Sequence, residues 1–273
     1  MPSTSPIEPP LVSVIMPAHN AALYLAEAIE SVLAQTWEKM ELIMVDDAST
    51  DKTEEIIRQY MKKDRRVRYL ENKFQSGQSA SRNRAIREAR GKYVMIVDSD
   101  DICLPARFAV QVAYMEKNPE IGILGTDWRY FTKDDQSDGV LASCPDDSLR
   151  RALPPVNNPT CCIRREIFDR YGYYDSRFDN AEDTELWFRW HAQGVRFANL
   201  HQVLYHKRTH ASNVSVLRLR SQIGLMLRIL VRSILRDRVR FSAVGYRRIG
   251  ETAAYYLYLS LRLDRLRKRI AAP

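Results

Sequence analysis

The feature that most constrains this chain is a repeated alternation of short apolar runs with amphipathic stretches. The apolar runs are 11–17, 41–47, 66–72 and 92–98. The stretches between them, in which apolar residues recur at helical spacing, are 21–35, 51–63 and 77–90. Strands that alternate with helices are typical of a mostly parallel sheet covered by helices. We therefore predict an α/β fold of the doubly wound, Rossmann-like type.

The pattern becomes less regular in the middle of the chain. Segment 160–172 is typical of a short strand that runs into a helix, and 181–194 of a helix with acidic residues in its first turn. The runs 195–200 and 202–210 are predicted to be two separate strands.

Acidic residues follow two of the predicted strands where each strand ends. Asp46 and Asp47 end the second strand, and the run "VMIVDSDD" places Asp98, Asp100 and Asp101 at the end of the fourth. A buried strand cannot hold ionised carboxylates unless they are paired or bound to a cation. In doubly wound sheets, ligands bind beyond the carboxyl ends of the strands. Two acidic clusters at that edge therefore indicate a binding site.

The Asp-x-Asp element at Asp98 and Asp100 has the hard oxygen ligands that Mg²⁺ and Mn²⁺ prefer. The alternative is a solvated turn whose aspartates cap a helix starting near Pro105. For Asp46 and Asp47, one carboxylate could accept hydrogen bonds from a base or from ribose hydroxyls. Alternatively, the run "DDASTD" forms a turn and a helix N-cap.

Five further side chains could carry chemistry. Glu182 and Asp183 open a predicted helix, where a carboxylate either complements the helix dipole or acts as a general base. His206 and His210 lie four residues apart, so they share one side of a predicted strand. Either histidine could reach a metal or a phosphate, or serve as a structural hydrogen-bonding group. Arg82 either pairs with a diphosphate or lies at the surface.

In this order, the motifs resemble glycosyltransferase family 2, the inverting enzymes of the GT-A fold. The resemblance runs from residue 12 to residue 215 of the 273-residue chain. It rests on "VSVIMPAHN" (12–20), "VDDASTD" (45–51), "GQSASRNRAI" (77–86), "GKYVMIVDSDD" (91–101), "AEDTELWFR" (181–189) and "YHKRTHASNVS" (205–215). Each motif is weak by itself, and their combination is specific.

The resemblance implies a nucleotide-sugar donor, most often UDP-linked, and a divalent metal, Mn²⁺ or Mg²⁺. The residues that it assigns to nucleotide-sugar binding are Pro17, Ala18, His19, Asn20, Asp46, Asp47, Arg82, Asp98 and Ser99. Those that it assigns to the metal are Asp100, Asp98 and His210, with Asp100 in direct contact. By the same resemblance, Asp183 is the catalytic base.

Two positions depart from the family pattern. His19 stands where many relatives have tyrosine. Processive polysaccharide synthases of the family carry Gln-x-x-Arg-Trp, and here Leu186 occupies the glutamine position before Arg189 and Trp190. We therefore expect transfer of one sugar, or a few, to a glycan or lipid-linked acceptor in cell-surface polysaccharide synthesis.

Charge divides the chain unevenly. The net charge is +8, yet from Val214 onward there are 14 Lys/Arg against 3 Asp/Glu, which leaves −3 for the remainder. This asymmetry predicts an attachment device at one end. The predicted divisions are a disordered leader (1–10), a GT-A domain (11–213) with a nucleotide-binding half (11–130) and an acceptor-side half (131–213), and a basic helical tail (214–273).

The tail contains two predicted helices, 216–241 and 251–270, that mix arginine with leucine and tyrosine. Such helices suit an anionic membrane surface, or they pack on the domain or form a homodimer; no nucleic acid is expected. No apolar run reaches the length of a membrane span, and the first residues lack the apolar core of a signal peptide. We therefore expect a cytoplasmic protein, peripheral at the inner face of the cell membrane.

Two other functions compete with glycosyl transfer. Phosphatases of the haloacid dehalogenase type also have a hydrophobic strand that ends in Asp-x-Asp. They usually continue with Thr or Val, where this chain has Asp101, and they place that strand near the N-terminus. The other alternative is a non-enzymatic adaptor that uses the basic tail to bind a membrane or nucleic acid.

Overall fold

The computed structural model describes residues 8–131, 141–142 and 156–210, and also residues 224, 225, 228, 229 and 232. Most of the predicted leader and most of the predicted tail lie outside the described residues. The division of the chain into leader, domain and tail therefore stays a prediction.

The described strands form one sheet, in the order β3-β2-β1-β4-β8-β6-β9-β5 with β7 beside β6. The strands are β1 (Val12–Ala18), β2 (Met40–Asp46), β3 (Val67–Glu71), β4 (Tyr93–Ile96), β5 (Ile102–Cys103), β6 (Ile121–Phe131), β7 (Leu141–Ala142), β8 (Cys162–Arg164) and β9 (Arg196–Arg208). The helices are α1 (Leu25–Leu33), α2 (Thr53–Lys63), α3 (Gln78–Glu88), α4 (Arg107–Lys117), α5 (Arg165–Tyr171) and α6 (Glu182–Ala192), with short 3₁₀ turns η2 (Asn158–Thr160) and η3 (Ser176–Phe178).

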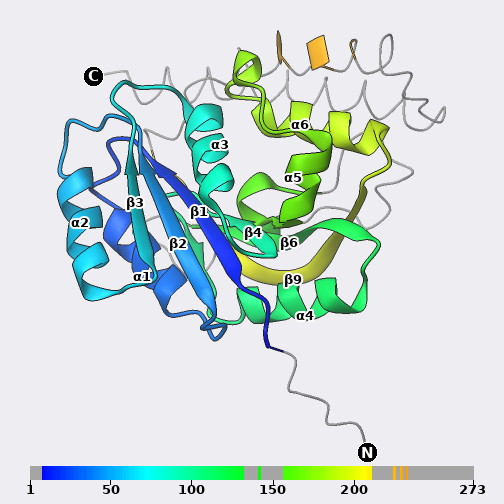
Figure 1. The fold of residues 1–273 in the computed structure, drawn as a ribbon, viewed down its shortest axis with the longest axis horizontal. Coiled ribbons are helices and arrows are strands. Elements are labelled where there is room, and N and C mark those ends of the chain that lie inside the picture. The colour runs from blue at the N-terminus through cyan, green and yellow to red at the C-terminus, as the bar shows by residue number, and fades with distance from the viewer. Residues whose placement is uncertain are drawn as a thin grey trace, which may run out of the picture.

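The first four strands pair in parallel, as the alternating sequence predicted (Figure 1). β1 lies between β2 and β4, and its last residue, Ala18, is paired with Asp46 at the end of β2. β8 then runs antiparallel between β4 and β6, whereas β9 is again parallel to β6. The α/β prediction with a mostly parallel sheet flanked by helices is confirmed.

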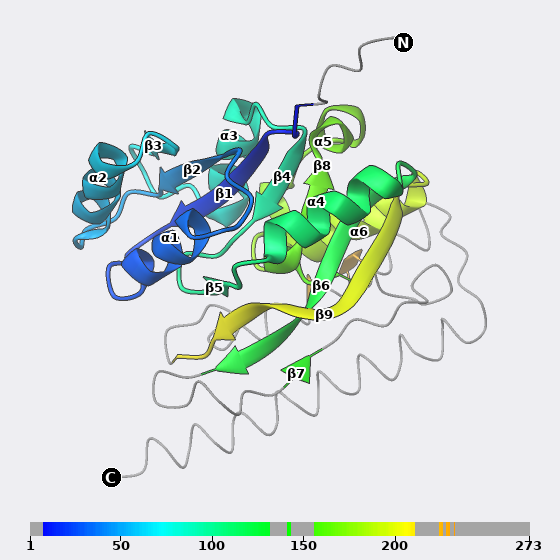
Figure 2. The same ribbon diagram turned by 90° about the horizontal axis from the view of Figure 1, so that it is seen from below.

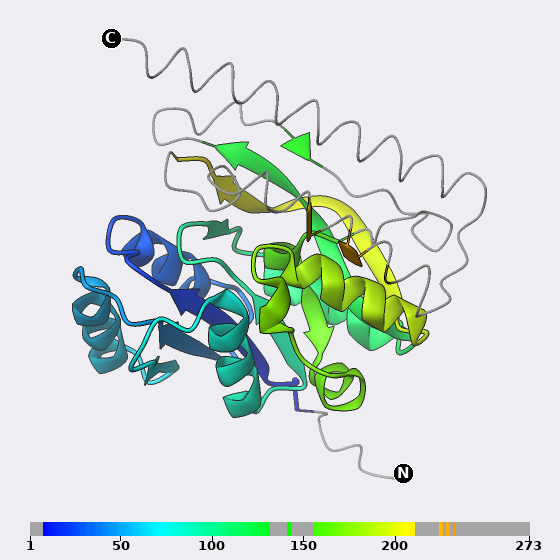
Figure 3. The ribbon, with the colours of Figure 1, turned by 90° about the horizontal axis from the view of Figure 1, so that it is seen from above.

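Alternate residues of the central strands face opposite helical layers. In β1, Val14 and Met16 join the core beneath α1 and α4, whereas Ile15 joins the core beneath α3, α5 and α6. Figure 2 shows α1 and α4 in front of the sheet, and Figure 3 shows α3 and α6 in front of the opposite face. Because both faces are covered, β1 and β2 are buried along their whole length, which explains their continuous apolar sequences.

Helix α1 illustrates how the sequence pattern produces the packing. Its buried residues, Leu25, Ala28, Ile29 and Val32, recur at spacings of three and four and so form one face of the helix. Fully burying a leucine, isoleucine or valine contributes about 1.5–3 kcal/mol relative to exposure. Among the described residues, no helix is both long and apolar enough to cross a membrane.

The prediction of two separate strands over 195–200 and 202–210 was wrong. The segment forms one strand, β9, whose register against β6 shifts where Thr126 and Asp127 face Leu200 and Val203. Two residues of β9 therefore lie between these two pairings. This irregularity breaks the alternation of buried and exposed side chains from which a strand is predicted in a sequence. Beyond it, β9 pairs with β5, which follows directly on the 98–101 turn. The end of β9 therefore lies beside the acidic cluster.

Candidate active site

The first part of the candidate site lies where β1 and β2 end. The backbone N–H of Asp47 donates to the carbonyl oxygen of Ala18 at 2.8 Å, and His19 Nδ1 lies 2.8 Å from the carbonyl oxygen of Asp47. Pro17 and Ala18 are buried within β1, whereas His19 and Asn20 are exposed beyond it. The structure thus brings the predicted nucleoside-binding segments of β1 and β2 together at one edge of the sheet.

The carboxylate of Asp47 connects this edge to the loop between β3 and α3. Its Oδ1 accepts hydrogen bonds from Asn72 Nδ2 at 2.7 Å and from the backbone of Ser76 at 2.9 Å, and its Oδ2 accepts from the backbone of Gly77 at 2.8 Å. Asp46 instead accepts from the backbone of Ser49 at 3.0 Å, as the turn interpretation predicted. The two adjacent aspartates therefore hold two different loops.

Three residues other than glycine have positive φ angles in the described part of the chain: Asn20 (49°), Ala48 (56°) and Asn180 (83°). Each lies within three residues of a predicted site residue. Such backbone conformations cost free energy for residues that carry a side chain, and they persist where surrounding contacts hold them. At Asn20 such a contact comes from the loop after β2, because its Oδ1 accepts a hydrogen bond from the backbone N–H of Thr50 at 2.8 Å.

The Asp-x-Asp turn combines two accessible acids with a buried one. The side chains of Asp98 and Asp100 are each 26% exposed, whereas Asp101 is 1% exposed. Burial and the neighbouring charge of Asp98 raise the pKa of Asp100. Burial, with Asp100 and Asp98, raises the pKa of Asp101 well above its usual value. Burial lowers the pKa of Lys207, but the carboxylates of Asp101 and Asp98 outweigh it and raise that pKa.

The end of β9 holds this turn through Arg208 and His210. The backbone N–H of Arg208 donates to Asp101 Oδ1 at 2.7 Å, and its Nε donates to the carbonyl oxygen of Asp100 at 2.8 Å. Its Nη2 reaches Glu27 Oε2 on α1 at 2.5 Å. His210 Nε2 lies 2.8 Å from Asp100 Oδ2. The predicted proximity of His210 to the acidic pair is therefore present in the structure.

His206 does not share this position. The sequence placed His206 and His210 on one side of a strand, but β9 ends at Arg208, so strand periodicity does not extend to His210. The ring of His206 packs against Phe131, with a centroid separation of 5.9 Å, and the residue pairs with Ile102 of β5. Of these two histidines, His210 is the one hydrogen-bonded to the acidic turn.

Glu182 and Asp183 open α6, as predicted. Glu182 is buried, and its two oxygens accept from Arg82 Nη1 at 2.5 Å and from the backbone of Asn180 at 2.8 Å. Burial raises the pKa of Glu182, while the charge of Arg82 opposes that shift. Asp183 is half-buried, and its Oδ1 accepts from the backbone of Thr184 at 2.7 Å. Asp183 is thus the more accessible acid of the pair.

Arg82 lies between the Asp-x-Asp turn and α6. Its Nη2 donates to Asp98 Oδ1 at 3.1 Å, while its Nη1 donates to Glu182. The side chain is 3% exposed, so the surface alternative for this arginine was wrong. Burial lowers its pKa, but Glu182 and Asp98 outweigh burial and raise the pKa further above its already high usual value. The arginine is therefore a permanent cation.

The acids at this edge fit a divalent cation by their chemistry. Within the described part of the chain, no three histidine, cysteine or acidic side chains are arranged to hold a metal ion by themselves. Mg²⁺ and related ions are commonly bound by one or two carboxylates together with substrate phosphates. Asp98 and Asp100 supply such carboxylates. Burial, and after it the charge of Asp98, raises the pKa of Asp100, and a bound cation would offset the repulsion between the two acids.

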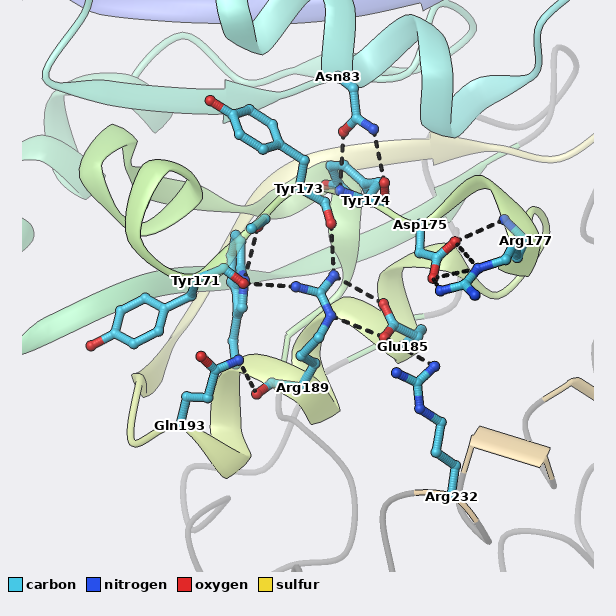
Figure 4. Close-up of polar contacts among 12 residues, drawn as sticks. Asn83, Tyr171, Tyr173, Tyr174, Asp175, Arg177, Glu185, Arg189, Gln193 and Arg232 are labelled. Carbon is cyan, nitrogen blue, oxygen red and sulfur yellow. Dashed lines mark hydrogen bonds and ion pairs between the residues drawn. The ribbon is translucent and has the colours of Figure 1, made fainter. Parts of the chain in front are cut away.

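Helix α6 is anchored to the segment before it by a second arginine (Figure 4). Arg189 pairs with Glu185 through two contacts of 3.0 Å and donates to the carbonyl oxygens of Tyr171 and Tyr173, each at 2.7 Å. Arg189 and Trp190 were compared with a processive-synthase motif in the sequence. In the structure they fix the orientation of the helix that carries Asp183.

Part of the predicted tail packs on α6. Leu225 and Ile229 lie in an apolar cluster with Ala181 and Phe188, and Arg232 Nη1 lies 3.9 Å from Glu185 Oε1. Residues 225, 229 and 232 follow helical spacing, so they form one face. For these residues, packing on the domain is the alternative that the structure supports.

Several residues of this site were not singled out in the sequence. They are Tyr205, Lys207 and Arg208, and of these Tyr205 OH accepts a hydrogen bond from the backbone N–H of Asp98 at 3.2 Å. Asp101 was counted in the acidic cluster but was given no role of its own. Asp101 directly follows the Asp-x-Asp element, and the other three lie in the motif "YHKRTHASNVS". The signal was therefore present, but the pairing of β9 with β5 was needed to interpret it.

Known proteins of one family match most of this chain. A model of the family described as Glycosyl transferase family 2 matches residues 13–184. The chain is 32% identical over 207 residues to the UDP-Glc:α-D-GlcNAc-diphosphoundecaprenol β-1,3-glucosyltransferase WfaP of Escherichia coli. That match covers 75% of this chain and 80% of WfaP.

Solved structures share the fold at lower identity. TarS 1–349 of Staphylococcus aureus in complex with UDP-GlcNAc matches with a TM-score of 0.67 and 23% identity, covering 84% of this chain and 68% of that chain. The mannosyltransferase PcManGT from Pyrobaculum calidifontis, in complex with GDP-Man and Mn²⁺, matches with a TM-score of 0.63 and 20% identity. That match covers 94% of this chain and 84% of the other. Both neighbours have the GT-A fold.

Proposed function

Because the chain belongs to glycosyltransferase family 2, we propose that it transfers a sugar from a UDP-linked donor to an acceptor hydroxyl, with a divalent metal and with inversion. The observation that carries this proposal is the convergence of two predicted acidic elements at one sheet edge. Asp98 of the Asp-x-Asp turn and Glu182, the neighbour of Asp183, both pair with Arg82. A donor diphosphate bound at the turn and the proposed base, Asp183, would thereby share one site.

The chemistry is divided between the two acidic elements. Asp100, Asp98 and His210 would hold Mn²⁺ or Mg²⁺, which when bound neutralises charge on the departing nucleoside diphosphate. The segments that include Asp47 would bind the nucleoside. Asp183 removes the proton from the acceptor hydroxyl while the oxygen attacks the anomeric carbon from the face opposite the leaving group.

A single displacement of this kind requires one base and no covalent enzyme intermediate. The new bond forms from the acceptor oxygen to the anomeric carbon. The bond between that carbon and the diphosphate oxygen breaks, and its electron pair stays on the departing diphosphate. The proton of the acceptor ends on Asp183. Inversion at the anomeric carbon follows from attack on the opposite face.

The donor class is testable by calorimetry with UDP, GDP and dTDP, each with and without Mn²⁺. A UDP-linked donor is supported by the similarity to WfaP, which is named a UDP-Glc glucosyltransferase, and to TarS, whose structure holds UDP-GlcNAc. We expect UDP to bind in a Mn²⁺-dependent manner and GDP and dTDP to bind more weakly. If none of the three nucleotides bound to the folded protein, the proposal would be refuted.

For the acceptor, we propose a lipid-linked glycan of cell-surface polysaccharide synthesis, reached at the inner face of the membrane. WfaP is named for a diphosphoundecaprenol acceptor. The basic tail, 214–273, carries 14 Lys/Arg against 3 Asp/Glu. Basic segments are attracted to anionic lipids by about 1 kcal/mol for each lysine or arginine near the surface. The tail would hold the 11–213 domain beside its acceptor.

The membrane proposal predicts a charge-dependent association with vesicles. The change is the triple substitution of Arg267→Glu, Lys268→Glu and Arg269→Glu in the full chain. Its partition onto vesicles containing anionic lipid should fall by about 100-fold or more, because three attractive charges become repulsive. Sedimentation with anionic and zwitterionic vesicles measures this. Equal binding of wild type and variant to anionic vesicles would contradict it.

A further inference from the structure

One face of α3 is joined by hydrogen bonds to the segment that leads into α6. Ser79 donates through its backbone N–H and its hydroxyl to Asp179 Oδ1. Asn83 exchanges two hydrogen bonds with the backbone of Tyr174, at 2.8 and 3.0 Å (Figure 4). Together with Arg82, these residues lie at helical spacings of three and four and so form one face. The polar face of α3 therefore fixes the position of the segment that leads into α6.

Arg82 differs from its neighbours on this face because it holds two elements. One Nη group pairs with Glu182 at the start of α6, and the other pairs with Asp98 at the end of β4. The planar guanidinium presents its donors in a rigid fork, so it sets the separation of the two carboxylates. Removal of one partner from a buried ion pair leaves an uncompensated charge, which is strongly destabilising.

We propose that Arg82 is a positioning residue that sets the distance between the Asp-x-Asp turn and the helix bearing Asp183. This inference rests on the proposed glycosyl transfer, because it concerns the alignment of the base with the donor. Arg82 acts through Asp98 and Glu182 and touches neither the donor nor the acceptor. The sequence interpretation, in which Arg82 pairs with the diphosphate, assigns the residue a different role.

The two roles predict different kinetic effects. A direct ligand of the diphosphate would contribute to nucleotide affinity, so its loss would raise the dissociation constant for UDP. A positioning residue contributes to alignment, and a misplacement of about 1 Å can cost about 100-fold in rate. Its substitution should therefore lower kcat and leave nucleotide affinity nearly unchanged.

The decisive variant is Arg82→Lys, which keeps the charge and removes the fork. We expect kcat to fall by about 100-fold, while the dissociation constant for UDP with Mn²⁺ stays within about 3-fold of the wild-type value. Glu182→Gln, which weakens the same contact from the other side, should lower kcat in the same way. An unchanged kcat, or a loss of UDP affinity with kcat preserved, would overturn the inference.

A double-mutant cycle tests the contact independently of activity. It uses Arg82→Met, Glu182→Gln and their combination, with urea unfolding as the readout; Arg82→Lys replaces Arg82→Met if the latter does not fold. We expect a coupling of about 100-fold in the unfolding equilibrium constant, as for a buried pair. The matched control is the exposed pair Arg58 and Glu54 on α2, for which about 2-fold is expected.

The two experiments separate failure of the inference from failure of the proposed function. A wild-type chain that transfers no sugar from any donor would refute the proposed function, whatever the coupling. An active wild-type chain whose Arg82 and Glu182 couple no more strongly than the control pair would refute the positioning role alone.

Discussion

Asp183→Asn should lower kcat by about 1,000-fold, within the range that positioned general bases contribute. The amide is nearly isosteric with the carboxylate and retains an oxygen that can accept from the backbone of Thr184, so α6 should begin as before. It cannot take the proton of the acceptor hydroxyl. The affinity for the donor should stay within about 3-fold, because the base acts on the acceptor.

The measurement is the steady-state rate of nucleoside diphosphate release, together with calorimetry of UDP binding. Asp169→Asn serves as the control, since Asp169 lies on α5 in an exposed pair with Arg165 and should leave both quantities unchanged. If Asp183→Asn kept the wild-type turnover, Asp183 would not be the catalytic base.

Asp100→Ala should abolish the Mn²⁺-dependent part of nucleotide binding. Asp100 is the partly exposed acid of the turn that contacts His210, and its pKa is raised by burial and by Asp98. Without this carboxylate the site loses an oxygen ligand and much of its attraction for a cation. The UDP affinity measured with Mn²⁺ should fall by more than about 100-fold, because loss of an outer-shell partner alone costs 10–100-fold.

Two histidines provide a matched comparison for this prediction. His210→Ala should weaken Mn²⁺-dependent UDP binding by about 10-fold or more, because His210 contacts Asp100. His206→Ala should leave it unchanged, because that ring packs against Phe131 instead. If His210→Ala weakened UDP binding no more than His206→Ala does, the contact of His210 with Asp100 would not contribute to the site in the way proposed. If Asp100→Ala still bound UDP in a Mn²⁺-dependent manner, the Asp-x-Asp turn would not be the metal site.

The fold was largely predictable because its central part is built from local pattern. The buried strands β1 and β2 have continuous apolar sequences, and α1 has its buried residues on one face. These signals lie within short windows of the chain, so they need no knowledge of distant contacts. The rule that ligands bind beyond the carboxyl ends of parallel strands then located Asp47, Asp98 and Asp100.

The contacts that tie the site together were not predictable in this way. Arg208 meets Asp101 across 107 positions in the chain, and Arg82 meets Glu182 across 100. Such pairs depend on the path of β9 beside β5 and on the docking of α6 against α3. Neither leaves a periodic trace in the sequence, and the register shift in β9 hid the continuity of that strand.

The tail shows the same division between composition and contact. Its excess of arginine indicated an attachment device, and three described residues, Leu225, Ile229 and Arg232, instead contact the domain. The prediction and the observed contact are compatible, because a helix can pack on the domain by one face and present another face to an anionic surface.

We propose that the acids at this sheet edge catalyse metal-dependent sugar transfer from a nucleotide donor. The most direct test is the rate of UDP release from a UDP-sugar by the full chain with Mn²⁺, after EDTA, and after Mn²⁺ is restored. We expect that EDTA abolishes turnover and that added Mn²⁺ restores it. Neither Asp100→Ala nor Asp183→Asn should release UDP at the wild-type rate under any of the three conditions. Release at the same rate in EDTA, or undiminished in both variants, would contradict it.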